Sequence, residues 1–250
     1  MDVQELMMGA ATPPAPLTLG TVALFLDLDG TLAPIVARPQ DVKPDARRTA
    51  LIDRLAQALH GRLAVLSGRT LTDLDHILEN RVRSVAGVHG LVLRGPDGEL
   101  RQVAAHPGIG RATAVLRQTA EQHPGLIVED KGVSVALHYR QAPQYATRAH
   151  EVAQRLAAET GLTLQPGSMV VELRTPGPTK GHSLRAYMAQ PPFTGATPVF
   201  VGDDLTDEDG FAAAAALGGY GVLVGPPRNT AAKATLPDVD AVMAWLEAAR

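Results

Sequence analysis

Four short apolar runs limit what this chain can fold into more than any other feature. Continuous apolar runs of about four to eight residues are typical of strands that are buried on both faces of a parallel sheet. Between the runs, apolar residues recur at helical spacing, which predicts helices that connect the strands. We therefore predict an α/β fold whose core has a mainly parallel sheet. The runs are Val22 to Leu28, RLAVLS at 62–67, TPVFVG at 197–202 and YGVLVG at 220–225.

Capping patterns mark two of the predicted helix starts. Thr70 and Asp73 stand three residues apart, the spacing of a capping box, which predicts a helix directly after the second run. Thr206 and Asp209 repeat that spacing after the third run. We expect a helix to begin there, with Glu208 in its first turn, because acidic residues favour the positive end of a helix.

An internal repeat interrupts the alternation of strands and helices. The segment GLIVEDKGVSVALHYR from Gly125 aligns with GLTLQPGSMVVELRTP from Gly161, 36 positions later, and a helical stretch precedes each. The shift predicts an αββ unit that is used twice, and so an inserted α+β domain at 105–177. Segments 19–104 and 178–250 are then predicted to form the core domain, and residues 1–18 a flexible lead-in.

Polar side chains alternate with apolar ones along the predicted strands of the insert. The alternation places the apolar residues on one face of its sheet and several charged residues together on the other. A polar face that is simply exposed to solvent has the same pattern, so alternation alone does not separate that reading from a binding surface. The charged residues are His138, Arg140, Glu172 and Arg174.

Composition and charge restrict the partners. The formal net charge is −3, whereas nucleic acid and anionic membranes favour a concentrated basic surface, so we expect neither as a partner. The chain has no Cys, so a metal would need oxygen or histidine ligands. No apolar run approaches the ~18 residues that span a bilayer, and the first residues lack the pattern of a secretory signal. We expect a cytoplasmic monomer that acts on a small molecule.

Acidic residues stand at the ends of two of the apolar runs. Asp27 and Asp29 lie at the end of the first run, and Asp203 and Asp204 come directly after the third. Ligands of open α/β sheets bind beyond the carboxyl ends of the strands, where these residues are expected to meet. Carboxylates crowded in this way repel one another unless a cation offsets them, although an Asp before Gly also commonly serves only a turn. Hard oxygen ligands predict Mg²⁺.

Two further segments favour an anionic ligand. Ser67 ends the second run, and Gly68 and Arg69 follow it at the start of a predicted helix, where backbone N–H groups and the helix dipole attract phosphate. Lys180 is predicted to begin another helix, a place that disfavours a cation by ~0.3–1 kcal/mol. We expect Asp204 or a bound phosphate to compensate for its charge.

Taken in order, these motifs resemble those of the haloacid dehalogenase superfamily of phosphotransferases. The matching segments are Asp27-Leu-Asp29-Gly-Thr, Ser67-Gly-Arg69, Lys180 and Gly-Asp203-Asp204-x-x-Asp207. The resemblance implies a Rossmann-like core. It also implies that Asp27 attacks phosphorus to form an aspartyl-phosphate, and that Asp29 first protonates the leaving alcohol and then takes a proton from water.

The same resemblance implies roles for the other matching residues. Ser67 and Lys180 would hold the phosphate oxygens. The Asp27 carboxylate, the Asp29 backbone carbonyl and Asp203 would hold Mg²⁺. Three residues would support these direct contacts. Asp204 would orient Lys180, Asp207 would support the metal's water molecules, and Arg69 is the third residue of this supporting group.

Three segments in and around the insert are similar to the trehalose-6-phosphate phosphatase family. They are AGVHG at 86–90, EDKGVSVALHYR at 129–140 and MVVELRTPGPTKG at 169–181, and the similarity covers about residues 20–245. The resemblance implies that the insert is an αββαββ cap. It also implies that Glu129, Lys131 and Glu172 bind glucose hydroxyls, with Arg140 and His138 as further candidates.

The sequence therefore predicts a Mg²⁺-dependent phosphatase that releases trehalose and phosphate from trehalose 6-phosphate. A phosphatase for another sugar phosphate, such as sucrose 6-phosphate or a glycosyl-glycerate phosphate, is the nearest alternative. A phosphomutase would retain Asp29 as well. A sugar-phosphate sensor without activity is less favoured, because it would not need Asp27, Asp29, Lys180 and the acidic loop together.

Overall fold

The computed structural model describes residues 12–250, which form two compact units. The core unit comprises the described residues up to Arg101 together with Pro178–Arg250, and the insert unit is Gln102–Gly177. The insert unit contains both copies of the internal repeat. None of the helices in residues 12–250 combines the length and the apolar character that are needed to cross a bilayer.

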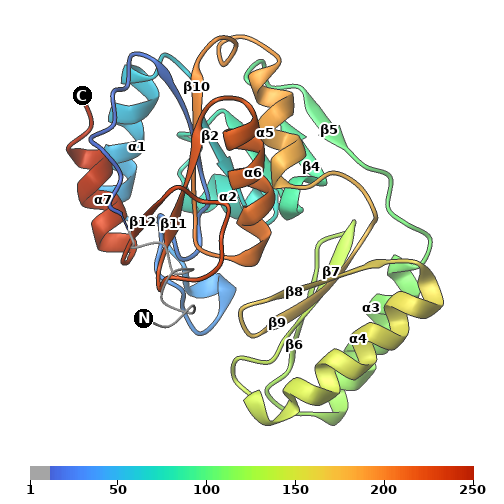
Figure 1. Cartoon of the computed structure of the whole chain (residues 1–250). Coiled ribbons are helices and arrows are strands. Elements are labelled where there is room, and N and C mark those ends of the chain that lie inside the picture. Colours follow the sequence, from blue (N-terminus) through green and yellow to red (C-terminus); the bar gives the residue numbers. More distant parts are fainter. Residues whose placement is uncertain (1–11) are drawn as a thin grey trace, which may run out of the picture. The chain divides into compact units, whose positions relative to one another are not determined.

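The core unit is built on one sheet (Figure 1). Its strands are β1 (Val22–Leu26), β2 (Leu63–Leu66), β3 (Ser84–Gly87), β4 (Val92–Arg94), β5 (Leu100–Gln102), β10 (Thr197–Gly202), β11 (Tyr220–Val224) and β12 (Ala234–Leu236). They lie in the order β12-β11-β10-β1-β2-β3-β4-β5. Every neighbouring pair from β12 to β3 is parallel, and β4 runs antiparallel to β3. The prediction of a mainly parallel sheet is confirmed.

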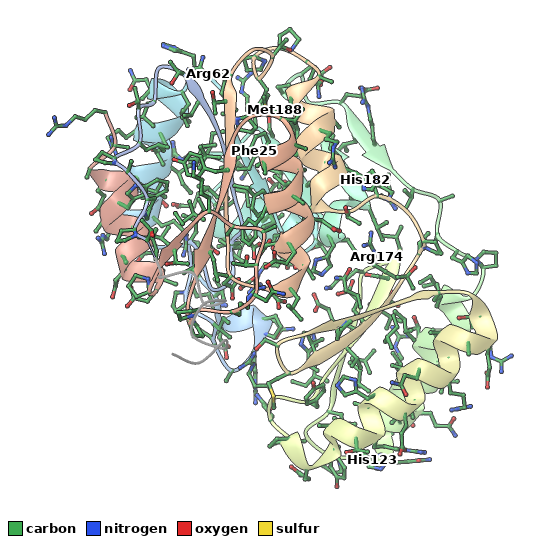
Figure 2. All side chains as sticks on the ribbon, in the orientation of Figure 1. Phe25, Arg62, His123, Arg174, His182 and Met188 are labelled. Carbon is green, nitrogen blue, oxygen red and sulfur yellow. The ribbon has the colours of Figure 1, made fainter. Side chains whose placement is uncertain are left out.

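Helices cover both faces of this sheet, because β1 is apolar on both sides. Leu24 and Leu26 pack in a cluster with α1, α2 and α7, whereas Ala23 and Phe25 pack with α5 and α6 on the other face. Figure 1 shows the helices beside the sheet, and Phe25 is labelled in Figure 2. Full burial of a Leu or Phe side chain contributes about 1.5–3 kcal/mol. The helices are α1 (Ala46–Ala58), α2 (Leu71–Ile77), α5 (Lys180–Met188), α6 (Glu208–Ala216) and α7 (Val239–Glu247), with short 3-10 turns η1 (Pro39–Asp41), η2 (Val88–Gly90) and η4 (Leu205–Asp207).

The first predicted helix start is confirmed, and the second is confirmed for Glu208, which lies in the first turn of α6, but not for the cap at Thr206. Thr70 caps α2, since its hydroxyl accepts a hydrogen bond of 3.2 Å from the Asp73 N–H. The capping box predicted at Thr206 does not form, because the chain first makes the turn η4 and α6 begins only at Glu208. Asp204 caps η4 instead, and its N–H donates to Asp207 Oδ2 at 3.0 Å.

The residues just before β1 pack against the end of the chain. The Leu17 side chain is 2% exposed, and its carbonyl accepts a hydrogen bond of 3.0 Å from the Arg250 N–H. The Trp245 indole N–H donates to the Ala15 carbonyl at 2.9 Å. Ala15 and Leu17 are thus held by α7 and by the last residue of the chain, so this part of the predicted lead-in is packed against the core unit. Residues 1–11 of that lead-in lie outside the described part.

The insert unit has two helices on one face of an antiparallel sheet (Figure 1). Its elements are α3 (Ile109–Gln122), β6 (Ile127–Asp130), β7 (Ser134–His138), the 3-10 turn η3 (Pro143–Tyr145), α4 (Ala146–Thr160), β8 (Thr163–Gly167) and β9 (Val170–Arg174). The strands lie in the order β6-β7-β9-β8. Strands β6 and β8 begin at Ile127 and Thr163, and β7 and β9 begin at Ser134 and Val170, so both pairs are 36 positions apart. The predicted αββαββ arrangement is confirmed.

Candidate active site

Three central strands of the core sheet end on polar residues at the same edge. Asp27 follows β1, Ser67 follows β2 and Asp203 follows β10. These strands are neighbours and parallel, and the Asp27 N–H donates to the Val201 carbonyl of β10 at 2.9 Å. Strand order therefore gathers side chains that are far apart in the sequence.

Asp27, Asp203 and Asp207 form one acidic cluster, with a carboxylate oxygen of each within 4.8 Å of the others. Gly30 permits this approach. It has a φ of 77°, and a Cβ at this position would overlap the Asp203 carboxylate. The first aspartate pair and the later acidic loop thus meet at the edge of the sheet, as the sequence predicts.

Lys180 lies inside this cluster. Its Nζ is 2.6 Å from Asp207 Oδ1 and 3.1 Å from Asp27 Oδ1, and its side chain is 2% exposed. Gly181 brings it there, because a Cβ at Gly181 would overlap the Asp209 carbonyl where α5 meets α6. Burial alone would lower the pKa of Lys180, but the charges of Asp207 and Asp27 raise it, so the ammonium stays protonated.

The structure corrects the roles that the resemblance gives to Asp204 and Asp207. Asp207 is the residue that holds Lys180, whereas the Asp204 carboxylate accepts a hydrogen bond from the Leu205 N–H at 2.7 Å. Both Asp207 oxygens are engaged, one with Lys180 and one with the Asp204 N–H. The physical reason is the turn η4, which directs its third residue, Asp207, back toward the strand ends.

The cluster has three carboxylates, those of Asp27, Asp203 and Asp207, and only one ammonium, Lys180, is described beside them. Burial raises the pKa of Asp203 to about 7, with a further contribution from Asp207. Burial also raises the pKa of Asp27 well above its ordinary value; the charge of Lys180 opposes the shift, and the neighbouring carboxylates add to it. An added cation would therefore stabilise the charged forms of Asp27 and Asp203.

These residues fit a hard divalent cation. Asp203 Oδ1 is buried and has no hydrogen-bond partner in the described part of the chain. Together with Asp27 it offers carboxylate oxygens of the kind that Mg²⁺ prefers. Since Asp207 already uses both of its oxygens, Asp27 and Asp203 are the better candidates for direct ligands.

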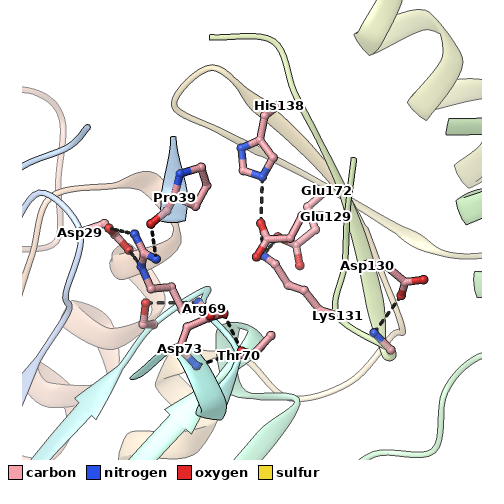
Figure 3. Close-up of polar contacts among 12 residues, drawn as sticks. Asp29, Pro39, Arg69, Thr70, Asp73, Glu129, Asp130, Lys131, His138 and Glu172 are labelled. Atoms are coloured by element: carbon pink, nitrogen blue, oxygen red, sulfur yellow. Dashed lines mark hydrogen bonds and ion pairs between the residues drawn. The ribbon is translucent and has the colours of Figure 1, made fainter. Parts of the chain in front are cut away.

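Arg69 holds Asp29 in a forked ion pair (Figure 3). Its Nε and Nη2 donate to the two Asp29 oxygens at 2.7 Å each, and its Nη1 donates to the Pro39 carbonyl at 2.8 Å. The Arg69 side chain is 9% exposed. The fork restricts the orientation of the Asp29 carboxylate, so Arg69 acts on Asp29 directly.

Ser67 is 1% exposed, and its hydroxyl accepts from the Arg69 N–H at 3.3 Å. The segment that contains it rests on the turn η2. The N–H groups of Val88 and His89 donate to the Arg69 and Ser67 carbonyls at 2.8 and 2.9 Å. Val88 and His89 adopt φ values of 49° and 55°, which are uncommon for residues other than glycine, so this support is maintained against strain.

Within the insert unit, four of the predicted binding residues form a second cluster (Figure 3). His138 Nε2 lies 2.8 Å from Glu129 Oε2, and Lys131 Nζ lies 3.0 Å from Glu172 and 3.7 Å from Glu129. Burial would raise the pKa of Glu129, but the hydrogen bond from His138 and the charge of Lys131 bring it below its ordinary value. Glu172 on β9 is paired in register with Ala136 on β7, so it lies beside the strand that ends at His138.

Arg140, the fifth predicted binding residue, contacts the turn between β8 and β9. It follows β7, and its Nη2 donates to the Ser168 carbonyl at 2.8 Å. Arg174 Nη1 donates to Gln165 Oε1 at 3.2 Å.

The sequence pattern does not predict one set of contacts around the acidic loop. Glu208, expected only to help start a helix, accepts hydrogen bonds from Thr230, the Ala231 N–H and Arg228. The partners come from the loop after β11, about twenty residues away, and no local spacing pattern marks them. The sequence does contain a signal for the position of Asp204 and Asp207. These residues also stand at capping-box spacing, which predicts a turn capped by Asp204.

Comparison with known proteins places these features in a family. A family model described as trehalose-phosphatase matches residues 25–239. The chain is 41% identical over 227 residues to trehalose-6-phosphate phosphatase of Escherichia coli, covering 90% of this chain and 85% of that protein. It is 36% identical over 207 residues to a probable trehalose-phosphate phosphatase of Sinorhizobium fredii, covering 82% and 78%.

Solved structures show a similar fold. The C-terminal domain of trehalose-6-phosphate phosphatase from C. albicans superposes with a TM-score of 0.82 at 24% identity, covering 95% of this chain and 98% of that one. A haloacid dehalogenase-like hydrolase from Bacteroides thetaiotaomicron gives a TM-score of 0.64 at 18% identity, covering 91% and 98%. Both likenesses support the predicted core with an inserted α+β unit.

Proposed function

Since the chain belongs to the trehalose-phosphatase family, we propose that it hydrolyses trehalose 6-phosphate to trehalose and phosphate at the edge of the core sheet. The observation that carries this proposal is the position of Asp27, buried beside Lys180 with Asp203 and Asp207 at the ends of parallel strands. One buried ammonium among acidic groups suits the binding of a phosphoryl group together with a divalent cation.

In the first step, an Asp27 oxygen attacks phosphorus. The new bond joins that oxygen to phosphorus, and the bond between phosphorus and the sugar oxygen breaks. Lys180 and the Ser67 hydroxyl hold the other phosphate oxygens, and Lys180 remains protonated throughout because acidic groups surround it. Asp207 fixes the Lys180 ammonium, so it cannot turn away when the charge on the phosphoryl group moves.

Asp29 moves the protons in both steps. It donates a proton to the sugar oxygen as the first bond breaks, and it takes a proton from the water that then hydrolyses the aspartyl-phosphate. The phosphate leaves and Asp27 is regenerated. The fork from Arg69 supports this role, because it holds the Asp29 carboxylate in one orientation.

We propose Mg²⁺ as the cation, held by the Asp27 and Asp203 carboxylates and the Asp29 carbonyl. When bound, it neutralises charge on the phosphate oxygens and reduces the repulsion between the carboxylates. The unpartnered Asp203 Oδ1 supports this assignment.

The insert unit is proposed to act as the cap and to recognise the sugar. Glu129 and Glu172 can each accept hydrogen bonds from two adjacent hydroxyls, and Lys131 and His138 can donate. A site built in this way rejects a sugar that leaves its buried groups unpaired. The expectations of a monomer and of a cytoplasmic location stay predictions.

Phosphate release tests the proposal. The purified chain with Mg²⁺ is given trehalose 6-phosphate, sucrose 6-phosphate and glucose 6-phosphate at equal concentration. We expect kcat/KM for trehalose 6-phosphate to exceed the others by about 100-fold or more. Equal rates would show that the site does not select trehalose 6-phosphate, a faster rate on another sugar phosphate would show that the sugar is another one, and transfer of the phosphoryl group within the sugar without release would indicate a mutase.

A further inference from the structure

A second layer of contacts connects the acidic loop to the loop that follows β11. Glu208 is the first residue of α6, directly after η4. Its carboxylate accepts hydrogen bonds from the Thr230 hydroxyl at 2.8 Å and the Ala231 N–H at 2.7 Å. Arg228 forms an ion pair with the same carboxylate through Nη1. Glu208 therefore fixes the loop after β11 to the start of α6.

Arg228 also reaches the other end of the acidic loop. Its Nη2 donates to the Asp204 carbonyl at 2.9 Å. The guanidinium thus joins the main chain at Asp204 to the carboxylate of Glu208, on both sides of η4. Two different nitrogens are needed for these two bonds. An ammonium group would act as a single point of charge and could not reproduce the fork.

The contacts continue from Arg228 to the cluster around Asp27. The Asp204 N–H donates to Asp207 Oδ2 at 3.0 Å, and Asp207 Oδ1 accepts from Lys180 at 2.6 Å. Lys180 in turn lies 3.1 Å from Asp27. A displacement of the Asp204 main chain would therefore be transmitted to Lys180 and to the adjacent Asp203.

The acidic loop needs such an anchor because its own charges oppose its geometry. Oxygens of Asp27, Asp203 and Asp207 lie within 4.8 Å of one another, so without a cation the loop would relax by moving Asp203 outward. A loop that is fixed at both ends keeps its ligands in place before the cation arrives. Preorganisation of this kind reduces the free energy that binding must supply.

We propose that Arg228 is a positioning residue for the divalent-cation site, and that it holds Asp203 in the binding geometry by bridging Asp204 and Glu208. This inference rests on the proposed function, because it takes the acidic cluster as the place where Mg²⁺ binds. Arg228 itself is not proposed as a ligand of the cation or of the substrate.

The test compares Mg²⁺ binding by the full chain, measured by calorimetry without substrate, in the wild type, R228M and R228K. Arg94→Met is the matched control, because Arg94 likewise joins a carboxylate, Asp75, to a main-chain carbonyl, that of Val82, and has a similar exposure of 21% against 25% for Arg228. We expect R228M to weaken Mg²⁺ binding about 10-fold and R228K at least 3-fold, whereas R94M leaves the dissociation constant unchanged.

Unfolding by urea without metal is measured in parallel. If R228M and R228K lose stability as R94M does but bind Mg²⁺ as tightly as the wild type, the role of Arg228 is purely structural and the inference is overturned. Should R228M not fold, Thr230→Val, which removes one of the Glu208 contacts, is expected to weaken Mg²⁺ binding by about 3-fold, and unchanged binding by T230V and R228K overturns the inference. A wild type that does not bind Mg²⁺ overturns the proposed function as well.

Discussion

The two polar clusters of this chain differ in how their charges are balanced. In the core unit, one ammonium, Lys180, lies among the carboxylates of Asp27, Asp203 and Asp207. In the insert unit, Lys131 lies within 3.7 Å of both Glu172 and Glu129, and His138 forms a hydrogen bond with Glu129. The core cluster therefore has three carboxylates around one ammonium, whereas each carboxylate of the insert cluster has a basic residue beside it.

This difference matches the two kinds of chemistry that the proposed reaction needs. A cluster with surplus negative charge takes up a cation and, with it, a dianionic phosphoryl group. A neutral sugar is better recognised by paired groups, which exchange one set of hydrogen bonds for another without a change in charge. The four predictions below test this contrast, from the largest expected effect to the smallest.

Asp27→Asn is expected to remove turnover almost completely. The amide cannot form the bond to phosphorus, so kcat should fall by about 10⁴-fold or more, as is usual for the loss of a covalent nucleophile. The measurement is phosphate release from trehalose 6-phosphate, with thermal unfolding to show that the variant is folded. Asp240→Asn, at a side chain that is 92% exposed, controls for the loss of one carboxylate. Retained turnover in D27N would contradict the nucleophile.

Glu172→Gln is expected to affect the sugar and leave the chemistry intact. Loss of the buried carboxylate removes a hydrogen-bond acceptor for the sugar and a partner of Lys131, so kcat/KM for trehalose 6-phosphate should fall by about 100-fold. Hydrolysis of p-nitrophenyl phosphate, which has no sugar, should change by less than about 3-fold.

The control for Glu172 is Glu159→Gln in the same unit, where the carboxylate is paired with arginines on the surface. Equal losses on both substrates would mean that Glu172 supports the fold of the insert unit and is not part of a sugar site.

The sequence alone predicts the sheet, the repeat and the place of the site. Asp27, Ser67 and Asp203 could be assigned to one edge because parallel strands align their carboxyl ends, so a one-dimensional pattern determines a three-dimensional neighbourhood. The αββ repeat was equally accessible, since the 36-residue shift of the sequence is preserved in the strand starts. The three-residue strand β12 was missed, because an element this short shows no periodicity.

The details within loops could not be predicted in the same way. Asp204 and Asp207 are three residues apart in one acidic segment, and the turn η4 alone decides which of them faces Lys180. The contact between Arg228 and Glu208 joins the start of α6 to the loop after β11, so no local spacing pattern predicts it. The ion pair of Arg69 with Asp29 joins residues that are forty positions apart in the sequence. From the sequence alone, an arginine at the start of a helix is equally consistent with a phosphate ligand.

The substitution Arg69→Met distinguishes two roles of Arg69, the positioning of Asp29 and the binding of phosphate. If the arginine positions Asp29, its loss matters most when the leaving oxygen needs a proton. We expect kcat for trehalose 6-phosphate to fall by about 30-fold, and kcat for p-nitrophenyl phosphate, whose leaving group needs none, by less than about 3-fold. Similar losses on both substrates would instead make Arg69 a phosphate ligand. Arg94→Met, which breaks the comparable fork to Asp75, is the control.

The smallest expected effect concerns how stability depends on pH in the absence of metal. The pKa of Asp203 is raised to about 7, so the folded chain holds this proton over a range in which the unfolded chain has lost it. This group therefore lowers stability as the pH rises from about 4 to 7. The lowered pKa of Glu129 acts in the opposite direction, because its contribution is present above its ordinary pKa and is lost only as the pH falls below that range.

Between pH 5 and pH 7.5 the two clusters are thus expected to behave differently. Mg²⁺ should raise the melting temperature more at pH 7.5 than at pH 5, because protons compete with it for Asp203. Asp203→Asn should raise the metal-free melting temperature at pH 7.5 and remove the response to Mg²⁺, whereas Glu172→Gln should lower that temperature, since it leaves Lys131 with one carboxylate fewer. If D203N lowers the metal-free melting temperature as E172Q does, the core cluster is no more strained by its charges than the insert cluster, and the contrast between them fails.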